Sequence, residues 1–440
     1  MSADDLAERL ERCLGGTVTS VRRLSGGASR ITSAVDLEGT DGTCRALILQ
    51  QRRSGGLHPT TGVAMETALL RAAAGAGVPV PGVVAAGTAD GLDDGWLVVE
   101  RLDGETIPRR ILRDDAFAGA RLVLVDDTAR ALARIHTLPP DGVPGLPRAD
   151  PLRRPLGFLD ATGEVRPVLE LTARWLEAHR PRPTGRTVVH GDYRMGNLLV
   201  DRSGLRGVLD WELAHAGDPA EDIGWLTAPP WRFGGAGVVG GFGDLDGFLA
   251  AYVGAGGVPV EPDTVRWWQV YATLKWAVIC ALQAATHLSG ATRSVELAAI
   301  GRRVCESEWD LLHLLGVPVP AAAAPGPPTA PFGRPTAVEL VGAVEGYLRD
   351  TVLPSSEGAA GFEARVAANA LAMVGRELVV GPVAAADHRL RLHGLGFADD
   401  AALAGAIRSG SCDERLDEVG AVLAHSVVDA LAVTGPGQRV

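Results

Sequence analysis

The sequence predicts an α+β protein with a small β-rich N-terminal region, a larger and mostly helical region, and a separate all-helical tail. Three observations predict this class. Residues 1–103 mix an opening helix with strand-like runs, apolar residues at helical spacing dominate residues 104–317, and a Pro- and Ala-rich run at residues 318–335 forms a linker before residues 336–440. A chain of 440 residues is also too long for one ordinary core, which favours two or three domains.

The composition narrows the partners. The net charge is −11, whereas nucleic acids and anionic membranes bind basic surfaces. The segment MSADDLAERLERC is charged and helical in pattern, unlike a signal peptide, and no stretch reaches about 18 uninterrupted apolar residues. The five cysteines are scattered, which fits a reducing compartment better than a disulfide framework. We therefore expect a cytoplasmic protein with no nucleic-acid or membrane partner.

The β-rich region carries four strand-like runs, at residues 19–23, 31–37, 45–50 and 96–101. An opening helix precedes them, and helical spacing over residues 62–74 predicts another helix between the third and fourth runs. Gly75, Gly77 and the prolines of VPVP prevent that helix from continuing. These elements predict a small antiparallel sheet with one helix against it.

The middle region has helical apolar spacing over residues 123–137, 169–179, 266–288 and 294–315. Two short strands, at 198–201 and 207–209, interrupt the helices and form a hairpin around residues 203–204.

The tail is expected to be a helical module of its own. Thr336 and Glu339 form a capping box that opens a helix. Val341, Val344 and Leu348 recur at helical spacing, which predicts that they form its buried face.

The segment VVHGDYRMGNLLVDRSGLRGVLDW, at residues 188–211, carries the chemistry. It contains His190, Asp192, Asn197 and Asp210 in that order. Transfer of a phosphoryl group needs a carboxylate that orients the attacking hydroxyl and accepts its proton, and an amide and a second carboxylate that hold magnesium. The hairpin lets Asn197 and Asp210 converge on one metal ion. A loop in which Asp and Asn only cap turns is the structural alternative.

HGDYRMGNLLVD followed by VLDWE resembles the signature of the aminoglycoside phosphotransferase (APH) family, which has a bilobal protein-kinase-like fold. The segments GDPAEDIGWL, WRFGG and KWAVICALQAATHLSG resemble a branch that includes kinase-like domains fused to some acyl-CoA dehydrogenases. The likeness covers roughly residues 17–317. The tail resembles a helical domain of unknown function that often follows such kinases.

The resemblance assigns a role to each chemical residue. It implies that Asp192 is the base, that Asn197 and Asp210 bind Mg²⁺, and that His190 braces the catalytic loop. Glu212 either assists the metal, faces the substrate or is an exposed charge.

The resemblance also places the nucleotide in the β-rich lobe. Ser25, Gly26 and Gly27 form a glycine-rich turn whose N–H groups can lie against phosphates, although a plain hairpin turn has the same composition. WLVVERLDG, at residues 96–104, resembles the hinge strand. The backbone around Glu100 and Leu102 would then hydrogen-bond a purine.

One feature departs from the family. A strand lysine, paired with a helix glutamate, usually grips the α- and β-phosphates, but the chain's single lysine is Lys275. The glutamate is expected at Glu66, and Gln50 occupies the position of the lysine. Gln supplies no charge, so we expect an arginine to neutralise the triphosphate, either Arg30 or one of the pair Arg52 and Arg53. The alternative is that these arginines only solvate the end of a strand.

The sequence therefore predicts a small-molecule kinase that uses ATP or GTP with Mg²⁺ to phosphorylate a hydroxyl group, and possible homodimers. The alternative is a catalytically inactive kinase-like module that binds a nucleotide or metabolite. The acceptor stays open between an aminoglycoside, a hydroxyacyl thioester and another metabolite.

Overall fold

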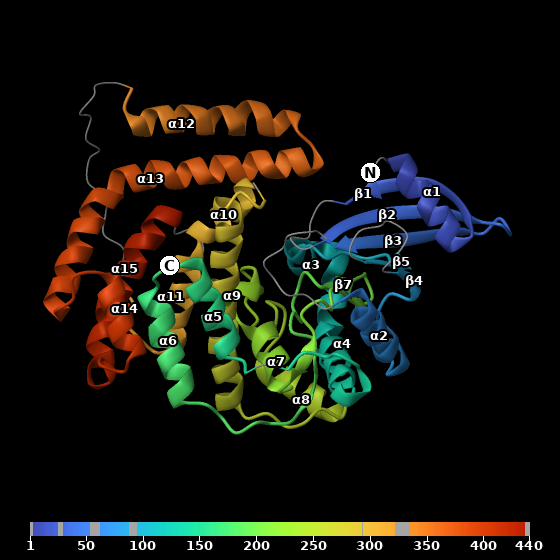
Figure 1. Cartoon of the computed structure of the whole chain (residues 1–440), viewed down its shortest axis with the longest axis horizontal. Coiled ribbons are helices and arrows are strands. Elements are labelled where there is room, and N and C mark those ends of the chain that lie inside the picture. Colours follow the sequence, from blue (N-terminus) through green and yellow to red (C-terminus); the bar gives the residue numbers. More distant parts are fainter. Residues whose placement is uncertain are drawn as a thin grey trace. The chain divides into compact units, whose positions relative to one another are not determined.

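The computed structural model describes residues 3–24, 30–52, 62–87, 95–148, 150–292, 294–321 and 335–435 (Figure 1). These residues form two compact units. The first contains Met1–Ala149 and Arg182–Gln269, and the second contains Asp150–Pro181 and Val270–Val440. The four-part division expected from the sequence, with boundaries at residues 103, 317 and 335, stays a prediction. Most of the Pro- and Ala-rich run, residues 322–334, lies outside the described residues.

The first unit begins with an antiparallel five-stranded sheet in the order β1-β2-β3-β5-β4. The strands are β1 (Gly16–Arg23), β2 (Arg30–Gly39), β3 (Cys44–Arg52), β4 (Val83–Gly87) and β5 (Trp96–Glu100). The four strands expected from the sequence are present, and the helix expected at 62–74 is α2 (Val63–Gly75). Strand β4 was not expected, because its short VVAAG run follows directly on the prolines.

One face of this sheet packs against helix α1, and the other face carries polar side chains. Val35 and Leu37 of β2 pack with Leu47 and Leu49 of β3 against α1 (Ala3–Leu14), which buries Leu6 and Leu10 among them. Side chains alternate along a strand, and Thr32 pairs with Gln50 across the ladder. Arg30, Thr32 and Gln50 therefore share the opposite face of the sheet.

The rest of the first unit holds short strand pairs between helices. The hairpin expected from the sequence is β7 (Leu198–Val200) with β8 (Leu205–Val208), and β6 (Thr187–Val189) pairs with β9 (His215–Gly217). Asp201 Oδ1 accepts hydrogen bonds from Ser203 N at 2.7 Å and Gly204 N at 3.2 Å, and these bonds close the hairpin turn. The helices are α3 (Pro108–Arg113), α4 (Ala118–His136), α7 (Ala220–Thr227) and α8 (Leu245–Gly254).

The described part of the second unit is helical. Its elements are α5 (Arg153–Thr162), α6 (Pro167–Ala178), most of α9 (Pro262–Leu288), α10 (Val295–Arg302), α11 (Val304–Leu314), α12 (Ala337–Tyr347), α13 (Gly358–Leu395), α14 (Asp400–Arg408) and α15 (Leu416–Thr434). The all-helical tail is thus confirmed, and α12 runs alongside α13 (Figure 1). The single helix expected over 294–315 is two helices that meet at Arg303.

The first tail helix confirms one expectation and corrects another. Thr336 N donates to Glu339 Oε2 at 2.6 Å and Glu339 N donates to Thr336 Oγ1 at 3.2 Å, which is the expected capping box. The expectation that Val344 lies on a buried face is wrong, because Val344 is 51% exposed and α12 fully buries none of its residues. Helical spacing shows which residues share a face, but it does not show whether that face is covered.

Helix α13 is the one described helix that is long and apolar enough to cross a membrane. Length and composition alone give this result, and core helices of water-soluble proteins pass the same test. The expected cytoplasmic location stays a prediction.

Candidate active site

The carboxylate of Asp192, in the loop between β6 and β7, is held from three sides by residues of this loop and of α7. Oδ1 accepts hydrogen bonds from Arg194 Nε at 2.9 Å and from Trp225 Nε1 at 2.8 Å. Oδ2 accepts from Asn197 Nδ2 at 2.6 Å. Asp192 is only 8% exposed, so these bonds replace most of its contact with water. A carboxylate held in this way has one orientation, as a general base requires.

Asp222, at the start of α7, anchors the loop through its backbone. Its Oδ2 accepts from His190 N at 2.7 Å and its Oδ1 from Gly191 N at 2.8 Å. Burial opposes ionisation, but hydrogen bonds from His136 and the His190 backbone hold the pKa of Asp222 below its ordinary value. Asp222 thus supports the backbone of the loop.

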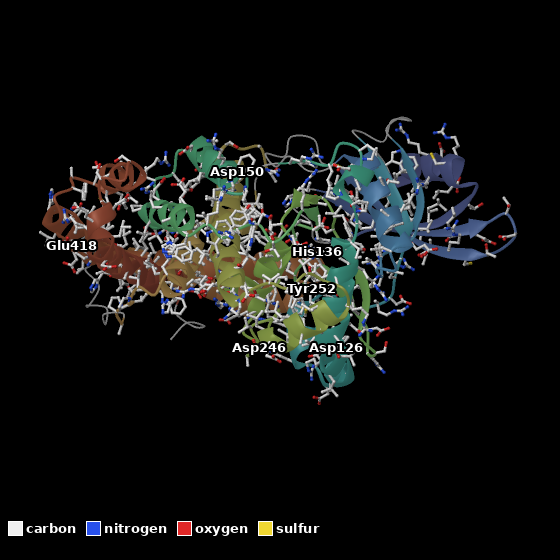
Figure 2. The ribbon with its side chains drawn as sticks, turned by 90° about the horizontal axis from the view of Figure 1, so that it is seen from below. Asp126, His136, Asp150, Asp246, Tyr252 and Glu418 are labelled. Atoms are coloured by element: carbon white, nitrogen blue, oxygen red, sulfur yellow. The ribbon has the colours of Figure 1, made fainter. Side chains whose placement is uncertain are left out.

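A second layer holds His136 in turn. His136 Nε2 lies 3.2 Å from Asp222 Oδ2, and its Nδ1 lies 2.7 Å from the hydroxyl of Tyr252. Figure 2 shows His136 and Tyr252 beside each other, on α4 and α8. Two helices far apart in the sequence thereby support the catalytic loop.

His190 braces the loop from inside. Its ring is fully buried, and Nδ1 accepts a hydrogen bond from Asp192 N at 3.2 Å. The ring packs 4.7 Å from the ring of Trp211 and 5.9 Å from that of Tyr193. Burial lowers the pKa of His190, so a neutral ring is favoured. These contacts fit a bracing role, because none of them presents the ring to a substrate.

Asn197 and Asp210 lie at the two ends of the β7–β8 hairpin. Leu209 N donates to Asn197 O at 2.8 Å. Asp210 directly follows Leu209, so this bond brings the backbone of Asp210 close to that of Asn197. Both amide hydrogens of Asn197 point toward Asp192, with Nδ2 also 3.0 Å from the Asp192 carbonyl oxygen. The amide oxygen Oδ1 is then the atom that Asn197 can offer to a cation.

Asp210 stands in a concentration of negative charge. Burial, followed by the carboxylates of Glu212 and Asp192, raises the pKa of Asp210 to about 8. Its backbone has a φ of 64°, a conformation that few residues other than glycine adopt. A bound divalent cation would relieve this repulsion, so the residues fit a magnesium ion. The described residues contain no group of three or more His, Cys, Asp or Glu that could hold a metal.

Arg30, at the start of β2, lies beside these acids. Its Nη1 is 2.6 Å from Glu66 Oε2 on α2 and 3.1 Å from Gln50 Oε1 on β3, and its Nε is 3.3 Å from Glu212 Oε2. The structure thus brings Gln50, Glu66 and Arg30 together. Ser25, Gly26, Gly27 and Arg53 lie outside the described residues, as does the side chain of Arg52.

In the expected hinge at the end of β5, one backbone N–H group already donates a hydrogen bond within the protein. Glu100 N donates to Gly82 O at 2.9 Å, so this N–H group is already used. Among the residues that the structure describes, none accepts a hydrogen bond from Leu102 N. The purine contact expected around Glu100 and Leu102 therefore narrows to the Glu100 carbonyl and the Leu102 N–H group, and it stays a prediction.

Arg194, Trp225 and Trp231 also belong to the site, although the sequence did not single them out. The guanidinium carbon of Arg194 lies 4.4 Å from the centre of the Trp231 ring, and Trp231 lies 5.3 Å from Trp225. Arg194 is two residues from Asp192, which was the only signal in the sequence. The tryptophans follow more than thirty residues later, and only the fold brings them to the loop.

The fold and the residues around Asp192 are those expected of a phosphoryl-transfer enzyme. A sequence profile of the phosphotransferase enzyme family (APH) matches residues 20–268, more than half of the chain. This chain belongs to that family. A second profile, for a domain of unknown function, matches residues 354–438.

Known proteins similar to the chain include the mouse (Mus musculus) acyl-CoA dehydrogenase family member 10, which is 29% identical over 219 residues, 46% of this chain and 20% of that protein. An Escherichia coli aminoglycoside 3'-phosphotransferase is 28% identical over 141 residues, 30% of this chain and 51% of that protein. A thiamine kinase of E. coli O157:H7 is 31% identical over 128 residues, 29% of this chain and 42% of that enzyme. The chain thus spans about half or less of each of these relatives.

One solved structure, a candidate aminoglycoside phosphotransferase from Ralstonia eutropha JMP134, matches with a TM-score of 0.56 at 19% identity. The match covers 72% of this chain and 98% of the other. This likeness concerns the fold alone, and with the family match it confirms the predicted fold class, including the added helical tail.

Proposed function

We propose that the chain is a kinase that transfers the γ-phosphoryl group of ATP or GTP to a hydroxyl group of a small molecule. The observation that carries the proposal is the carboxylate of Asp192, held by Arg194, Trp225 and Asn197 directly before a hairpin that ends in Asp210. Membership of the phosphotransferase family supports the proposal. Each of the three roles that phosphoryl transfer needs also has a residue of the required type in this chain.

Asp192 acts as the base. The acceptor's oxygen attacks the γ-phosphorus as the bond from that phosphorus to the β-phosphate oxygen breaks, and the hydroxyl proton passes to Asp192. The nucleoside diphosphate leaves with the electrons of the broken bond. The hydrogen bonds from Arg194 and Trp225 both reach Oδ1, so they orient the carboxylate toward one acceptor position.

Asn197 Oδ1 and the carboxylate of Asp210 would hold Mg²⁺, which neutralises phosphate charge when bound. The Asp192–Asn197 hydrogen bond sets the rotation of the amide, so the base and the metal ligand are positioned together. The backbone at Leu102 would receive the purine, and the turn at Ser25, Gly26 and Gly27 would lie over the phosphates.

The similarity to a dehydrogenase-linked relative favours an acyl thioester as the acceptor. The match to the acyl-CoA dehydrogenase family member 10 spans 46% of this chain, compared with 30% for the aminoglycoside 3'-phosphotransferase. Arg194 does not discriminate between the acceptor classes, because its charge is offset by Asp192 at 2.9 Å. Among the acceptors left open by the sequence, we therefore expect hydroxyacyl thioesters and related hydroxy acids rather than aminoglycosides.

A coupled assay for nucleoside diphosphate release tests the proposal. The protein is incubated with Mg·ATP or Mg·GTP and a panel of hydroxy acids, hydroxyacyl thioesters, thiamine and aminoglycosides. We expect acceptor-dependent turnover with a member of the first two groups and none with Asp192→Asn. Tight nucleotide binding without turnover for any acceptor would instead support the inactive binding module. Turnover with aminoglycosides alone would contradict the assigned acceptor class.

A further inference from the structure

We propose that Arg30 on β2 supplies the positive charge that grips the α- and β-phosphates, in place of a lysine on β3. This inference rests on the proposed function, because it assigns a residue to the nucleotide that the kinase would use. It moves the cation to the neighbouring strand.

Strand β3 has no cation where one is expected. Gln50 occupies that position, and the chain's single lysine, Lys275, lies in α9 of the second unit. Magnesium leaves about two negative charges on a bound triphosphate, which a neutral amide cannot balance. A cation must come from another strand or be absent.

The register of the sheet places Arg30 where it can replace that cation. Thr32 is paired with Gln50, and Arg30 lies two residues from Thr32 on the same strand and therefore on the same face. The diagonal step is short enough that Arg30 Nη1 donates to Gln50 Oε1 at 3.1 Å. Arginine is longer than lysine, which compensates for a starting point one pleat away.

The partners of Arg30 are those expected of the missing lysine. Nη1 is 2.6 Å from Glu66 Oε2. Glu66, on α2, is the residue expected from the sequence to pair with the strand lysine. Arg30 is 9% exposed and Glu66 is 2% exposed, so the pair is well shielded from water. Gln50 is the third member of this cluster. Its side chain is neutral and its Oε1 accepts a hydrogen bond from Arg30, so the two side chains can lie next to each other without repulsion.

The carboxylates around Arg30 keep its guanidinium charged and would attract a metal cation. Burial opposes the charged form, but Glu66, Glu212 and Asp210 raise the pKa of Arg30, so the guanidinium stays charged. One arginine faces three carboxylates, and Mg²⁺ would offset this excess of negative charge. Nη1 and Nε are used by the protein, while Nη2 donates to no acceptor among the residues that the structure describes. That N–H group can reach a phosphate oxygen.

The competing explanation is that Arg30 only ties α2 to the sheet through Glu66. Both explanations predict that removing Arg30 destabilises the fold, because Glu66 would be left buried and charged. They differ in what happens to phosphate recognition. A purely structural arginine affects adenosine and ADP binding equally, whereas a phosphate ligand affects ADP alone.

Titration calorimetry with Mg·ADP and, separately, with adenosine distinguishes them. We expect Arg30→Gln to weaken Mg·ADP binding roughly 10- to 100-fold, with adenosine affinity unchanged. Arg30→Gln combined with Gln50→Lys returns a cation to β3 and should recover most of the lost affinity. Arg45→Gln, which removes an exposed charge from β3, is the matched control and should bind both ligands as the wild type does.

If Arg30→Gln does not fold, Arg30→Gln with Glu66→Gln removes both charges of the buried pair and is measured instead, with the same expected loss for Mg·ADP alone. Wild-type affinity for Mg·ADP in either variant overturns the role of Arg30 and leaves the proposed function standing. Equal losses for adenosine and Mg·ADP, with no recovery from Gln50→Lys, overturn it as well. A wild-type protein that binds neither ligand contradicts the proposed function itself, and the inference with it.

Discussion

At the scale of single residues, the site depends on contacts that join positions far apart in the sequence. The spacing of the motif was enough to propose roles for Asp192, Asn197 and Asp210, and these roles stay predictions. Trp225 could not, because its hydrogen bond to Asp192 spans 33 residues. The sequence left three arginines as candidates for the cation that neutralises the triphosphate. The structure shows that Arg30 contacts Glu66, while the side chains of the other two lie outside the described residues.

Arg194 allows a direct test of how the base is held. Arg194→Gln removes the charged donor from Asp192 Oδ1, so we expect kcat to fall by roughly 10²-fold while Mg·ADP affinity is unchanged. Arg194→Lys should recover part of the loss. The exposed Arg202, in the turn of the β7–β8 hairpin, provides the control Arg202→Gln. Unchanged turnover in Arg194→Gln would show that Trp225 and Asn197 suffice to hold the carboxylate.

At the scale of elements, the spacing of apolar residues and the positions of glycine and proline predicted the longer helices and strands. Strands β1, β2, β3 and β5 have enough β-branched or other apolar residues to be recognised, and glycines and prolines mark the end of α2. Strands β6 and β9 have three residues each, which is too short for an alternating pattern to be recognised, and β6 is wholly buried. Their pairing depends on tertiary contacts that sequence periodicity does not contain.

Asp222 links the loop that carries Asp192 to α7, and removing this link should lower the stability of the fold. Asp222→Ala leaves the buried N–H groups of His190 and Gly191 without their acceptor, and each such loss costs about 1–3 kcal/mol. We therefore expect the free energy of unfolding, measured with urea at pH 7, to fall by about 3 kcal/mol.

The pH dependence of that difference follows from the lowered pKa of Asp222. The carboxylate is ionised in both states above the ordinary aspartate pKa, so its stabilising contribution is fully present at neutral pH. Protonation of the folded state removes it, and the gap between wild type and Asp222→Ala should narrow only below about pH 4. A gap that narrows between pH 7 and pH 5 would assign the effect to another group.

At the scale of the whole chain, the tail is more closely integrated than its linker suggested. A Pro- and Ala-rich run predicts few contacts across it, and therefore a tail whose removal leaves the rest of the chain intact. Within the second unit, however, Arg408 Nε donates to Glu170 Oε2 at 2.9 Å, and Arg174 Nη2 donates to Asp413 Oδ2 at 2.6 Å. Helices α14 and α15 thus share a core with α6 and α11.

Cutting the chain is a sharper test of this integration than deleting the tail. A protease site inserted near Pro325 allows cleavage after folding. We expect the two fragments to elute together from a sizing column in moderate salt. Expression of residues 1–325 alone should give a protein that unfolds at lower temperature, since α6 and α11 lose their apolar neighbours. Fragments that separate freely without loss of stability would restore the independent module.

The central claim is that Asp192 is the base of an ATP- or GTP-dependent transfer to a hydroxyl group. Single-turnover kinetics of Asp192→Asn, with the best acceptor from the screen, measure it most directly. If Asp192 is the base, the transfer step should be slower by about 10²–10⁴-fold, with Mg·ADP and adenosine affinities equal to those of the wild type. A transfer rate within a few-fold of the wild-type rate would contradict it.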